Sequence, residues 1–272
     1  MDRDPNRAEE RDLGHRNLIA SSAALSRWAT RGAVEDGAGA VLYASGSWVP
    51  VELNGAFRTD EELDPDDLVA RADRFFGPRG RGYTAKVRDD GSDEDVRAAL
   101  KRGGLEPFGE PSPQMICRAR PEGGAPSEGL EVRTVSSLAE VADFVAVNAD
   151  AYSTYGLPRE EMAAVFDRPE GLLDTREAVA VVAYDGSGPV AAALTFLSDG
   201  IAGLYFVGTV ERGRNRGLGR CIATAATDVG FDRGARFVIL QASPMGAPVY
   251  RAMGYETLYH YEDYIRWTAP PT

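Results

Sequence analysis

The sequence is poor in the residues from which many common sites are built. It has only two cysteines, Cys117 and Cys221, which are far apart and in no metal-binding spacing. It has only two histidines, His15 and His260, so a histidine metal site or a Ser-His-Asp triad has almost no material. We therefore expect no disulfide, no bound metal and no histidine-based catalysis.

Long apolar segments are also lacking. No apolar run reaches the roughly 18 residues of a membrane-spanning helix, and the charged first 17 residues do not resemble a signal peptide. The formal net charge of −12 disfavours general nucleic-acid binding and mildly favours a cationic substrate. These features predict a cytoplasmic protein with neither a membrane nor a nucleic-acid partner.

The length of 272 residues is comfortable for two domains, and an apolar fraction of 43% suits an ordinary globular core. A loop-like stretch, "RPEGGAPSEG" at 120–129, is typical of a linker. We therefore expect one domain over 1–122 and a second over 123–272.

The second half alternates between strand and helix patterns. Asp185-Gly186 and Asp199-Gly200 predict tight turns that divide 178–210 into three strands. The remaining expected elements are a strand at 130–137, helices at 138–153 and 159–166, a helix at 218–234, a strand at 235–243, a helix at 247–255 and a strand at 257–267.

The first half is less regular but resembles the second. Its expected helices are 17–29, 64–77 and 93–104, and its expected strands are 40–45, 51–57, 82–88 and 113–120. Aligning Gly104 with Gly254 places Leu100 opposite Tyr250. The match is either a coincidence between two ordinary β-α-β segments or, as we prefer, a duplicated fold whose first copy has lost its ligand-binding parts.

The turn "ERGRNRGLGR" at 211–220 concentrates glycine and arginine between an expected strand and an expected helix. A helix N-terminus offers unpaired N–H groups and partial positive charge, and glycines let a ligand approach the backbone closely. With Arg214, Arg216 and Arg220 beside it, the turn is typical of a pyrophosphate cradle. A Walker loop would need a lysine in this turn, and a dinucleotide-binding fingerprint would need its glycines in a different order. The alternative that this is a glycine-rich helix start with no ligand is left open.

"VGTVERGRNRGLG" resembles the coenzyme A motif of the GNAT superfamily of N-acetyltransferases, Arg/Gln-x-x-Gly-x-Gly/Ala, which Arg214, Gly217 and Gly219 fill. "APVYRAMGYE" resembles the closing motif of the same family. The resemblance covers about 130–268 and implies an α/β (α+β) fold. It further implies two tandem GNAT-like domains, each a mixed, mostly antiparallel sheet flanked by helices. The first, over 1–122, is degenerate, and the catalytic domain over 123–272 binds acetyl-CoA.

The resemblance also implies roles for individual residues. Backbone groups of Val207, Gly208 and Thr209 would hold the pantetheine arm, and Tyr250 would donate a proton or hydrogen bond to the departing thiolate. Ser243 stands where many relatives carry an asparagine that contacts the same arm. The pyrophosphate would be bound by Arg214, Asn215, Arg216, Gly217, Leu218, Gly219 and Arg220.

The acceptor side is less defined. Asp150, Tyr152 and Tyr155 fall in 148–161, where relatives place the segment that covers the acceptor, although a solvated loop with capping residues explains them equally. Glu262 and Asp263 are further candidates for the base. Which group takes the proton of the amine stays open, as does the use of a water chain.

The function that follows is transfer of an acetyl group from acetyl-CoA to a primary amine of a small molecule or peptide. A mycothiol-synthase-like transferase and a catalytically silent CoA-binding module are the alternatives. The sequence identifies neither the acceptor nor the oligomeric state, and a homodimer stays open. We expect CoA to bind the second half only, and the fragment 126–272 to bind it if that fragment folds alone.

Overall fold

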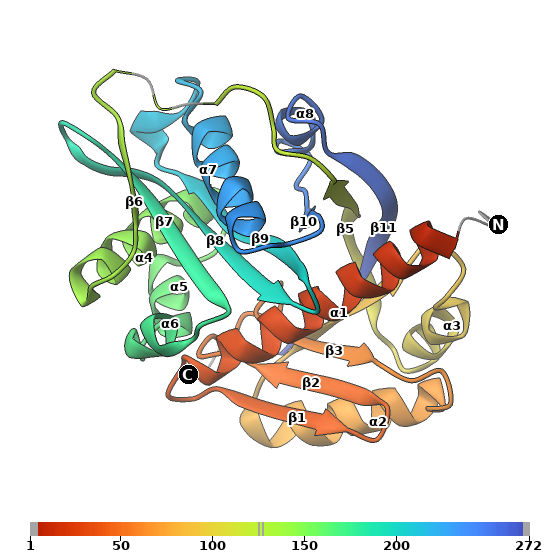
Figure 1. The fold of residues 1–272 in the computed structure, drawn as a ribbon. Helices are drawn as coiled ribbons and strands as arrows, with labels where there is room; N and C mark the ends of the chain where they lie inside the picture. The colour runs from red at the N-terminus through yellow and green to blue at the C-terminus, as the bar shows by residue number, and fades with distance from the viewer. Residues whose placement is uncertain (1–4, 125, 127, 269–272) are drawn as a thin grey trace. The chain divides into compact units, whose positions relative to one another are not determined.

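The computed structural model describes residues 5–124, 126 and 128–268 (Figure 1). Their contacts define two compact units, drawn from the ranges 1–21, 113–163 and 168–258 (unit 1) and from 22–112, 164–167 and 259–272 (unit 2). These ranges depart from a simple division after residue 122. Residues 5–21 lie with the second half of the chain, and residues 259–268 lie with the first half.

The sheet of unit 1 is mixed and mostly antiparallel, as the sequence predicted. Its only parallel pair among the described strands joins β9 to β10, while the other neighbours run antiparallel. The predicted turn at Asp199-Gly200 is present, and both residues have positive φ (50° and 74°). The strand order is β5 (Glu106–Cys117), β10 (Val238–Gln241), β9 (Ile201–Thr209), β8 (Gly188–Ser198), β7 (Ala178–Asp185) and β6 (Glu131–Thr134).

Helices α4 (Leu138–Ser153) and α7 (Leu218–Asp232) cover opposite faces of β8 and β9 (Figure 1). Gly230 lets α7 approach β9, because a Cβ there would lie 2.9 Å from the Cβ of Ala202. Gly208 does the same on the other face for α4. The shorter helices of this half are α5 (Arg159–Val165), α6 (Glu170–Asp174) and α8 (Ala247–Arg251).

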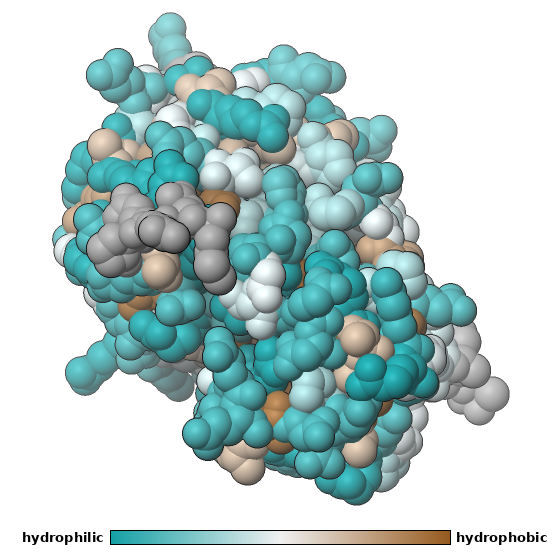
Figure 2. Space-filling model, turned by 90° about the vertical axis from the view of Figure 1, so that its right-hand side faces the viewer, coloured by the Kyte–Doolittle hydropathy of each residue, from teal (hydrophilic) through white to brown (hydrophobic). Residues whose placement is uncertain are grey.

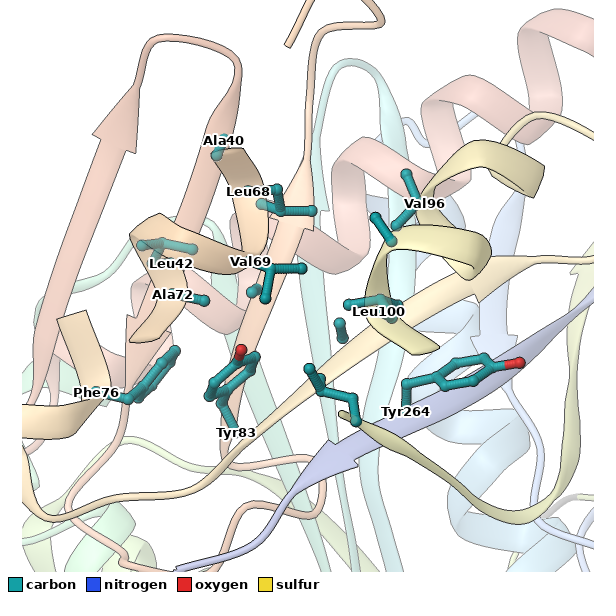
Figure 3. Close-up of a cluster of buried hydrophobic side chains, with 14 of the residues drawn as sticks. Ala40, Leu42, Leu68, Val69, Ala72, Phe76, Tyr83, Val96, Leu100 and Tyr264 are labelled. Carbon is teal, nitrogen blue, oxygen red and sulfur yellow. The ribbon is translucent and has the colours of Figure 1, made fainter. Parts of the chain in front are cut away.

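Unit 2 repeats this plan on a smaller scale. Its strand order is β1 (Ala33–Gly37), β2 (Ala40–Ala44), β3 (Asn54–Arg58), β4 (Tyr83–Arg88) and β11 (Glu256–Arg266), and only β3 and β4 run parallel. Helices α2 (Pro65–Phe76) and α3 (Glu94–Arg102) pack on one face, and the turn η1 (Gly77–Arg79) follows α2. Figure 3 shows the resulting core, in which Phe76 stacks on Tyr83 at 4.8 Å.

The two units exchange their closing strands. In each half a parallel strand pair encloses a helix (β3-α2-β4 and β9-α7-β10), and a second helix and a strand follow. β5 follows α3 in the chain but pairs with β10 of unit 1, and β11 follows α8 but pairs with β4 of unit 2. This exchange explains why the contact-defined units do not follow the order of the chain.

Polar contacts fix each exchanged strand in its place. Asp263 of β11 accepts a hydrogen bond of 2.9 Å from Lys86 of β4, and Glu262 one of 3.0 Å from Arg97 of α3. On β5, the amide oxygen of Gln114 accepts a hydrogen bond of 2.6 Å from Gln241 of β10. These side-chain contacts link each exchanged strand to the sheet that it joins.

The predicted helix at 17–29 is instead α1 (Pro5–Arg27), twelve residues longer at its start. Its first half carries no apolar stripe, and the tertiary contact of Leu13 with Ile116, Ile201 and Ile239 stabilises it. β1 and α6 were not predicted, because neither has a clear apolar period. α4 begins at Leu138 as predicted, because the Ser137 hydroxyl caps it by accepting from the Glu140 N–H at 3.3 Å.

No helix among the described residues is long and apolar enough to cross a membrane. Over the same residues, no group of three or more His, Cys, Asp or Glu side chains is arranged to hold a metal ion. The face of the molecule drawn in Figure 2 is largely hydrophilic, and its apolar residues are scattered rather than gathered in one patch.

Candidate functional site

The site begins where β9 and β10 cease to pair. Their parallel register comprises Ala202 with Val238 and Gly203 with Ile239, and no pair beyond Gly203 joins them in the described part of the chain. The β10-facing edge of β9 from Leu204 to Thr209 therefore leaves main-chain groups that β10 does not use. Val207, Gly208 and Thr209, predicted from the sequence to hold a pantetheine arm, lie on this stretch.

A bulge reshapes the same stretch of β9. Tyr205 pairs with Leu194 and Gly208 with Ala192, so Phe206 and Val207 together oppose one residue of β8. Phe206 has φ of +51°, a conformation that a bulky side chain adopts only when its surroundings impose it. The bulge turns Gly208 against α4 and Thr209 toward the start of α7.

The glycine turn forms an open cradle at the start of α7. Asn215 and Gly217 have positive φ (58° and 76°), and the first helical hydrogen bond runs from the Cys221 N–H to the Gly217 carbonyl at 3.1 Å. The N–H groups of 218–220 therefore have no acceptor one turn earlier in the helix. A Cβ on Gly217 would meet no protein atom within 4 Å, and one on Gly219 only Thr209 Oγ1 at 3.7 Å. This geometry suits an anion at close range.

The arginines of the turn are held by flanking segments. Arg214 donates to Thr154 Oγ1 at the end of α4 (3.2 Å), and Arg216 donates to Asp185 at the end of β7 (3.0 Å). Arg220 donates to the carbonyl of Glu122 at 3.0 Å. Hydrogen bonds from Ser187, with the guanidinium of Arg216 adding to them, lower the pKa of Asp185 to about 2. Three arginines thus lie at the start of α7, and one of them is paired with a carboxylate.

Tyr250 lies on α8, which follows the free end of β10. The turn before α8 is closed by Ser243, whose hydroxyl accepts from the Gly246 N–H at 3.1 Å and whose carbonyl accepts from the Ala247 N–H at 3.0 Å. Burial, and to a lesser extent Tyr155, raises the pKa of the Tyr250 hydroxyl, which therefore stays protonated at neutral pH. Ser243 thus positions the helix of Tyr250, and its contact with a pantetheine arm stays a prediction.

Asp150, the predicted acceptor-side acid, is committed to structural contacts. Its Oδ2 accepts from the Glu211 N–H at 2.9 Å, and its Oδ1 accepts from Arg159. Partial burial opposes ionisation, but these two donors outweigh it and lower the pKa of Asp150. A carboxylate held in this way is a weak base, and it links α4 to the glycine turn.

Tyr152 and Tyr155 are brought together with β9. The Tyr152 ring lies 6.1 Å from that of Phe206 and 6.2 Å from that of Tyr155. Glu262 and Asp263, the alternative bases suggested by the sequence, lie instead in unit 2 and are paired with Arg97 and Lys86. Burial raises the pKa of Asp263 against the pull of Lys86.

Sequence reasoning missed Asn148. This side chain of α4 is fully buried, and its Nδ2 donates to the Phe144 carbonyl at 3.0 Å. Its Oδ1 has no hydrogen-bond partner and would lie 3.1 Å from a Cβ on Gly208. A buried asparagine in an apolar helix stripe is the only sequence signal that points to it.

A scan of family models and a search of curated protein sequences found no match to the chain. Solved structures do match over most of its length. A GCN5-related N-acetyltransferase from Kribbella flavida is 20% identical, with 93% of this chain and 96% of that chain covered and a TM-score of 0.64. A tandem GNAT protein from the clavulanic acid biosynthesis pathway is 14% identical, with 90% and 86% covered and a TM-score of 0.58.

The chain has the fold of the tandem GNAT proteins. A GCN5-related N-acetyltransferase from Sphaerobacter thermophilus agrees, at 19% identity, 88% and 83% coverage and a TM-score of 0.57. The tandem GNAT fold accounts for the repeated β-α-β plan of the two units. Unit 1 contains both the RxxGxG turn at 214–219 and a pair of parallel strands, β9 and β10, that stop pairing after Gly203.

Unit 2 differs at the corresponding helix. α2 joins the parallel strands β3 and β4 as α7 joins β9 and β10, but its N-cap is Asp64, whose carboxylate accepts from the Asp66 N–H at 2.9 Å. Asp66 and Asp67 add two further acidic groups in the first turn. Carboxylates satisfy the N-terminus of α2 and would repel a phosphate, so this helix start, unlike that of α7, is unsuited to bind an anion.

Proposed function

We propose that the protein is an N-acetyltransferase that transfers the acetyl group of acetyl-CoA to a primary amine of a small molecule or peptide. The observation that carries the proposal is the combination of an open anion cradle at Gly217–Arg220 with a buried, protonated Tyr250 in the same unit. The GNAT fold supports acetyl transfer as the reaction of this site.

The residues present fit acetyl-CoA as a co-substrate. The first N–H groups of α7 and the guanidinium of Arg214 would bind the pyrophosphate, in exchange for the neutral hydroxyl that Arg214 now contacts. The unused β9 edge at Val207 and Thr209 would pair with the amides of the pantetheine arm. Acetyl-CoA supplies an activated thioester, and no metal is needed for its aminolysis.

Tyr250 would act at the sulfur. As the amine nitrogen forms a bond to the acetyl carbon, the carbon–sulfur bond breaks and the hydroxyl of Tyr250 donates a hydrogen bond or its proton to the thiolate. The attacking nitrogen must lose a proton, because an alkylamine of pKa about 10.4 is almost wholly ammonium at pH 7. Asp150 is a poor base for this proton, so release to water is the simplest route.

Unit 1 would then carry out catalysis. Unit 2 would be the degenerate copy that binds no CoA, in keeping with the acidic N-terminus of its helix α2. A cytoplasmic location stays a prediction, and a homodimer stays open. A mycothiol-synthase-like activity and a silent CoA-binding module remain the competing functions, and no observation favours either over general amine acetylation.

The test is CoA release from acetyl-CoA with a panel of primary amines, with the N-acetyl product identified by mass spectrometry. We expect amine-dependent release of one CoA for each product. Binding of acetyl-CoA without product from any amine would instead support the silent module. Absence of acetyl-CoA binding in a folded protein would overturn the proposal.

A further inference from the structure

A pocket of about 370 Å³ lies in unit 2, between the edge strand β1 and the C-terminal half of α2. Three guanidinium groups and one carboxylate give its lining a net charge of +2, in a protein whose formal net charge is −12. The proposed acetyl transfer in unit 1 makes no use of this cationic pocket. Its lining residues come from β1, α2 and η1 and are Val34, Glu35, Arg71, Arg74, Phe75 and Arg79.

Arg71 forms one wall of the cationic pocket. Its guanidinium donates to Glu35 Oε1 at 2.8 Å and to the Ala38 carbonyl, in the turn after β1, at 2.7 Å. These contacts tie α2 to the β1-β2 hairpin, and the charges of Arg71 and Glu35 offset each other. The net positive charge of the lining therefore comes from Arg74 and Arg79.

Arg74 and Arg79 keep hydrogen-bond donors for a ligand. The Arg79 guanidinium lies 4.0 Å from the centroid of the Phe75 ring and donates to the Phe75 carbonyl, so most of its five N–H groups stay available. No hydrogen bond, ion pair or ring contact ties the Arg74 side chain to a residue that the structure describes. Because guanidinium groups bind carboxylates and phosphates through paired hydrogen bonds, the two arginines suit an oxyanion.

The carboxylates in the neighbouring sequence do not cancel this charge. Asp73, next to Arg74 in α2, is paired with Arg266 at 2.8 Å. Asp36 of β1 and Asp67 in the first turn of α2 do not belong to the lining. The one carboxylate that does belong to it already has its arginine partner. An anion in the pocket would thus meet two cations without a competing carboxylate in the lining.

The cationic pocket is separate from the part of unit 2 that corresponds to the glycine turn of unit 1. That part is the acidic N-terminus of α2, whereas Arg74 lies in the last turn of the same helix. At 1.5 Å per residue, about 12 Å of helix separates Asp66 from Arg74. The pocket is therefore no remnant of a CoA cradle.

We infer that the cationic pocket is a binding site for a small organic dianion, either a phosphate monoester or a dicarboxylate. Arg74 and Arg79 would bind the anionic group, and Val34 and Phe75 would contact the carbon atoms that carry it. The net charge of +2 matches a dianion, and a phosphate monoester carries about two negative charges at pH 7. The volume lies within the range of about 300–1,000 Å³ that is typical of small-molecule sites. This binding does not depend on acetyl transfer in unit 1.

The experiment titrates the ¹⁵N-labelled full chain with glycerol 3-phosphate, succinate or uncharged glycerol at low salt and follows the amide resonances by NMR. We expect saturable binding of at least one dianion, no binding of glycerol, and weaker binding in about 0.5 M sodium chloride. Tighter binding of glycerol 3-phosphate would identify a phosphate monoester site, and tighter binding of succinate a dicarboxylate site. Arg74→Gln and Arg79→Gln should each raise the dissociation constant about fivefold, the upper end for an exposed ion pair.

Two control variants test where the dianion binds. Arg102→Gln removes one positive charge from the same unit at a 60% exposed side chain, and Arg214→Gln changes the glycine turn of α7. Unchanged dissociation constants in both controls, with loss of affinity in Arg74→Gln, would support the inference. Equal loss in Arg102→Gln would attribute binding to overall charge, and loss in Arg214→Gln alone would attribute it to the glycine turn. Either result, or no binding of both dianions, would overturn the inference and leave the proposed acetyl transfer intact.

Discussion

Leu100 and Tyr250 occupy the same place in two copies of one helix-to-strand corner. The Leu100 carbonyl accepts from the Leu105 N–H at 2.9 Å, and the Tyr250 carbonyl accepts from the Tyr255 N–H at 3.0 Å. In both corners a glycine with positive φ precedes the donor, Gly104 at 80° and Gly254 at 91°. The two corners share this geometry, as the alignment of the two halves predicts, and only Tyr250 of the aligned pair carries a hydroxyl.

Tyr250→Phe removes that hydroxyl and keeps the ring and its packing against Tyr255. We expect kcat to fall about a hundredfold, the low end for a positioned general acid, because a thiolate is already a fair leaving group. The dissociation constant of acetyl-CoA should barely change. An unchanged kcat with an identified acceptor would return Tyr250 to a packing role.

Gly219→Ala tests the anion cradle. A methyl group here has room in the protein but projects where a pyrophosphate must approach, so the dissociation constant of acetyl-CoA should rise at least about tenfold, or 1.4 kcal/mol. The free energy of unfolding should rise by up to about 1 kcal/mol, because alanine favours the helix. Gly217→Val is a poorer test, since Gly217 has φ of +76° and any side chain there strains the fold.

The control for this variant is Gly77→Ala in unit 2, which adds the same methyl group where no protein atom lies within 4 Å. It should leave acetyl-CoA affinity unchanged. Calorimetry that finds equal affinity for Gly219→Ala and the wild type would contradict the cradle.

The strand exchange alters what isolated halves can do. A fragment 126–272 lacks β5, so β10 loses its antiparallel partner over Gln114–Cys117, and the segment 259–268 loses its β4 partner. We expect this fragment to be largely unfolded by circular dichroism and unable to bind acetyl-CoA. Co-expression with 1–125 should restore folding and binding, and a well-folded lone fragment would contradict the expectation.

Asn148→Leu removes a buried oxygen that has no partner. We expect the free energy of unfolding to rise by about 1 kcal/mol, because the cost of an unsatisfied buried acceptor disappears. Asn54→Leu is the matched control, since all the polar groups of buried Asn54 are bonded, to Ser45, Ser47 and Val49. That variant should lose about 2–3 kcal/mol. Equal destabilisation of both variants in urea would show that Asn148 has a bonding role.

Asp150→Asn tests the link between α4 and the glycine turn. The folded-state pKa of Asp150 is lowered, so its ionised form contributes stability above its ordinary pKa of 3.8, and this contribution is lost as pH falls through the folded-state value. The variant should be about 1 kcal/mol less stable than the wild type at pH 7. The gap should close as pH falls through the lowered pKa that Asp150 has in the folded state. A gap independent of pH would contradict an ionic role.

The sequence alone predicted most of the elements, though not β1 or α6, and the place of the glycine turn, because these depend on local chemistry. Asp199-Gly200 encodes its turn directly, Ser137 encodes the start of α4, and Gly217 encodes the left-handed entrance to α7. The equivalence of Leu100 and Tyr250 could also be predicted from the sequence, since each residue lies four positions before a glycine, Gly104 or Gly254.

Only the tertiary structure decided which strand closes which sheet. β5 and β11 each follow a short helix in the chain, and their exchange is accompanied by long-range contacts such as Lys86 with Asp263 and Gln241 with Gln114. The hydrogen bond that Asp150 accepts from the Glu211 N–H, and the place of the Asn148 oxygen beside Gly208, likewise depend on residues about 60 positions away in the chain. Periodicity and capping report on neighbours in the chain, whereas pairing and burial are settled by the free energy of the assembled core.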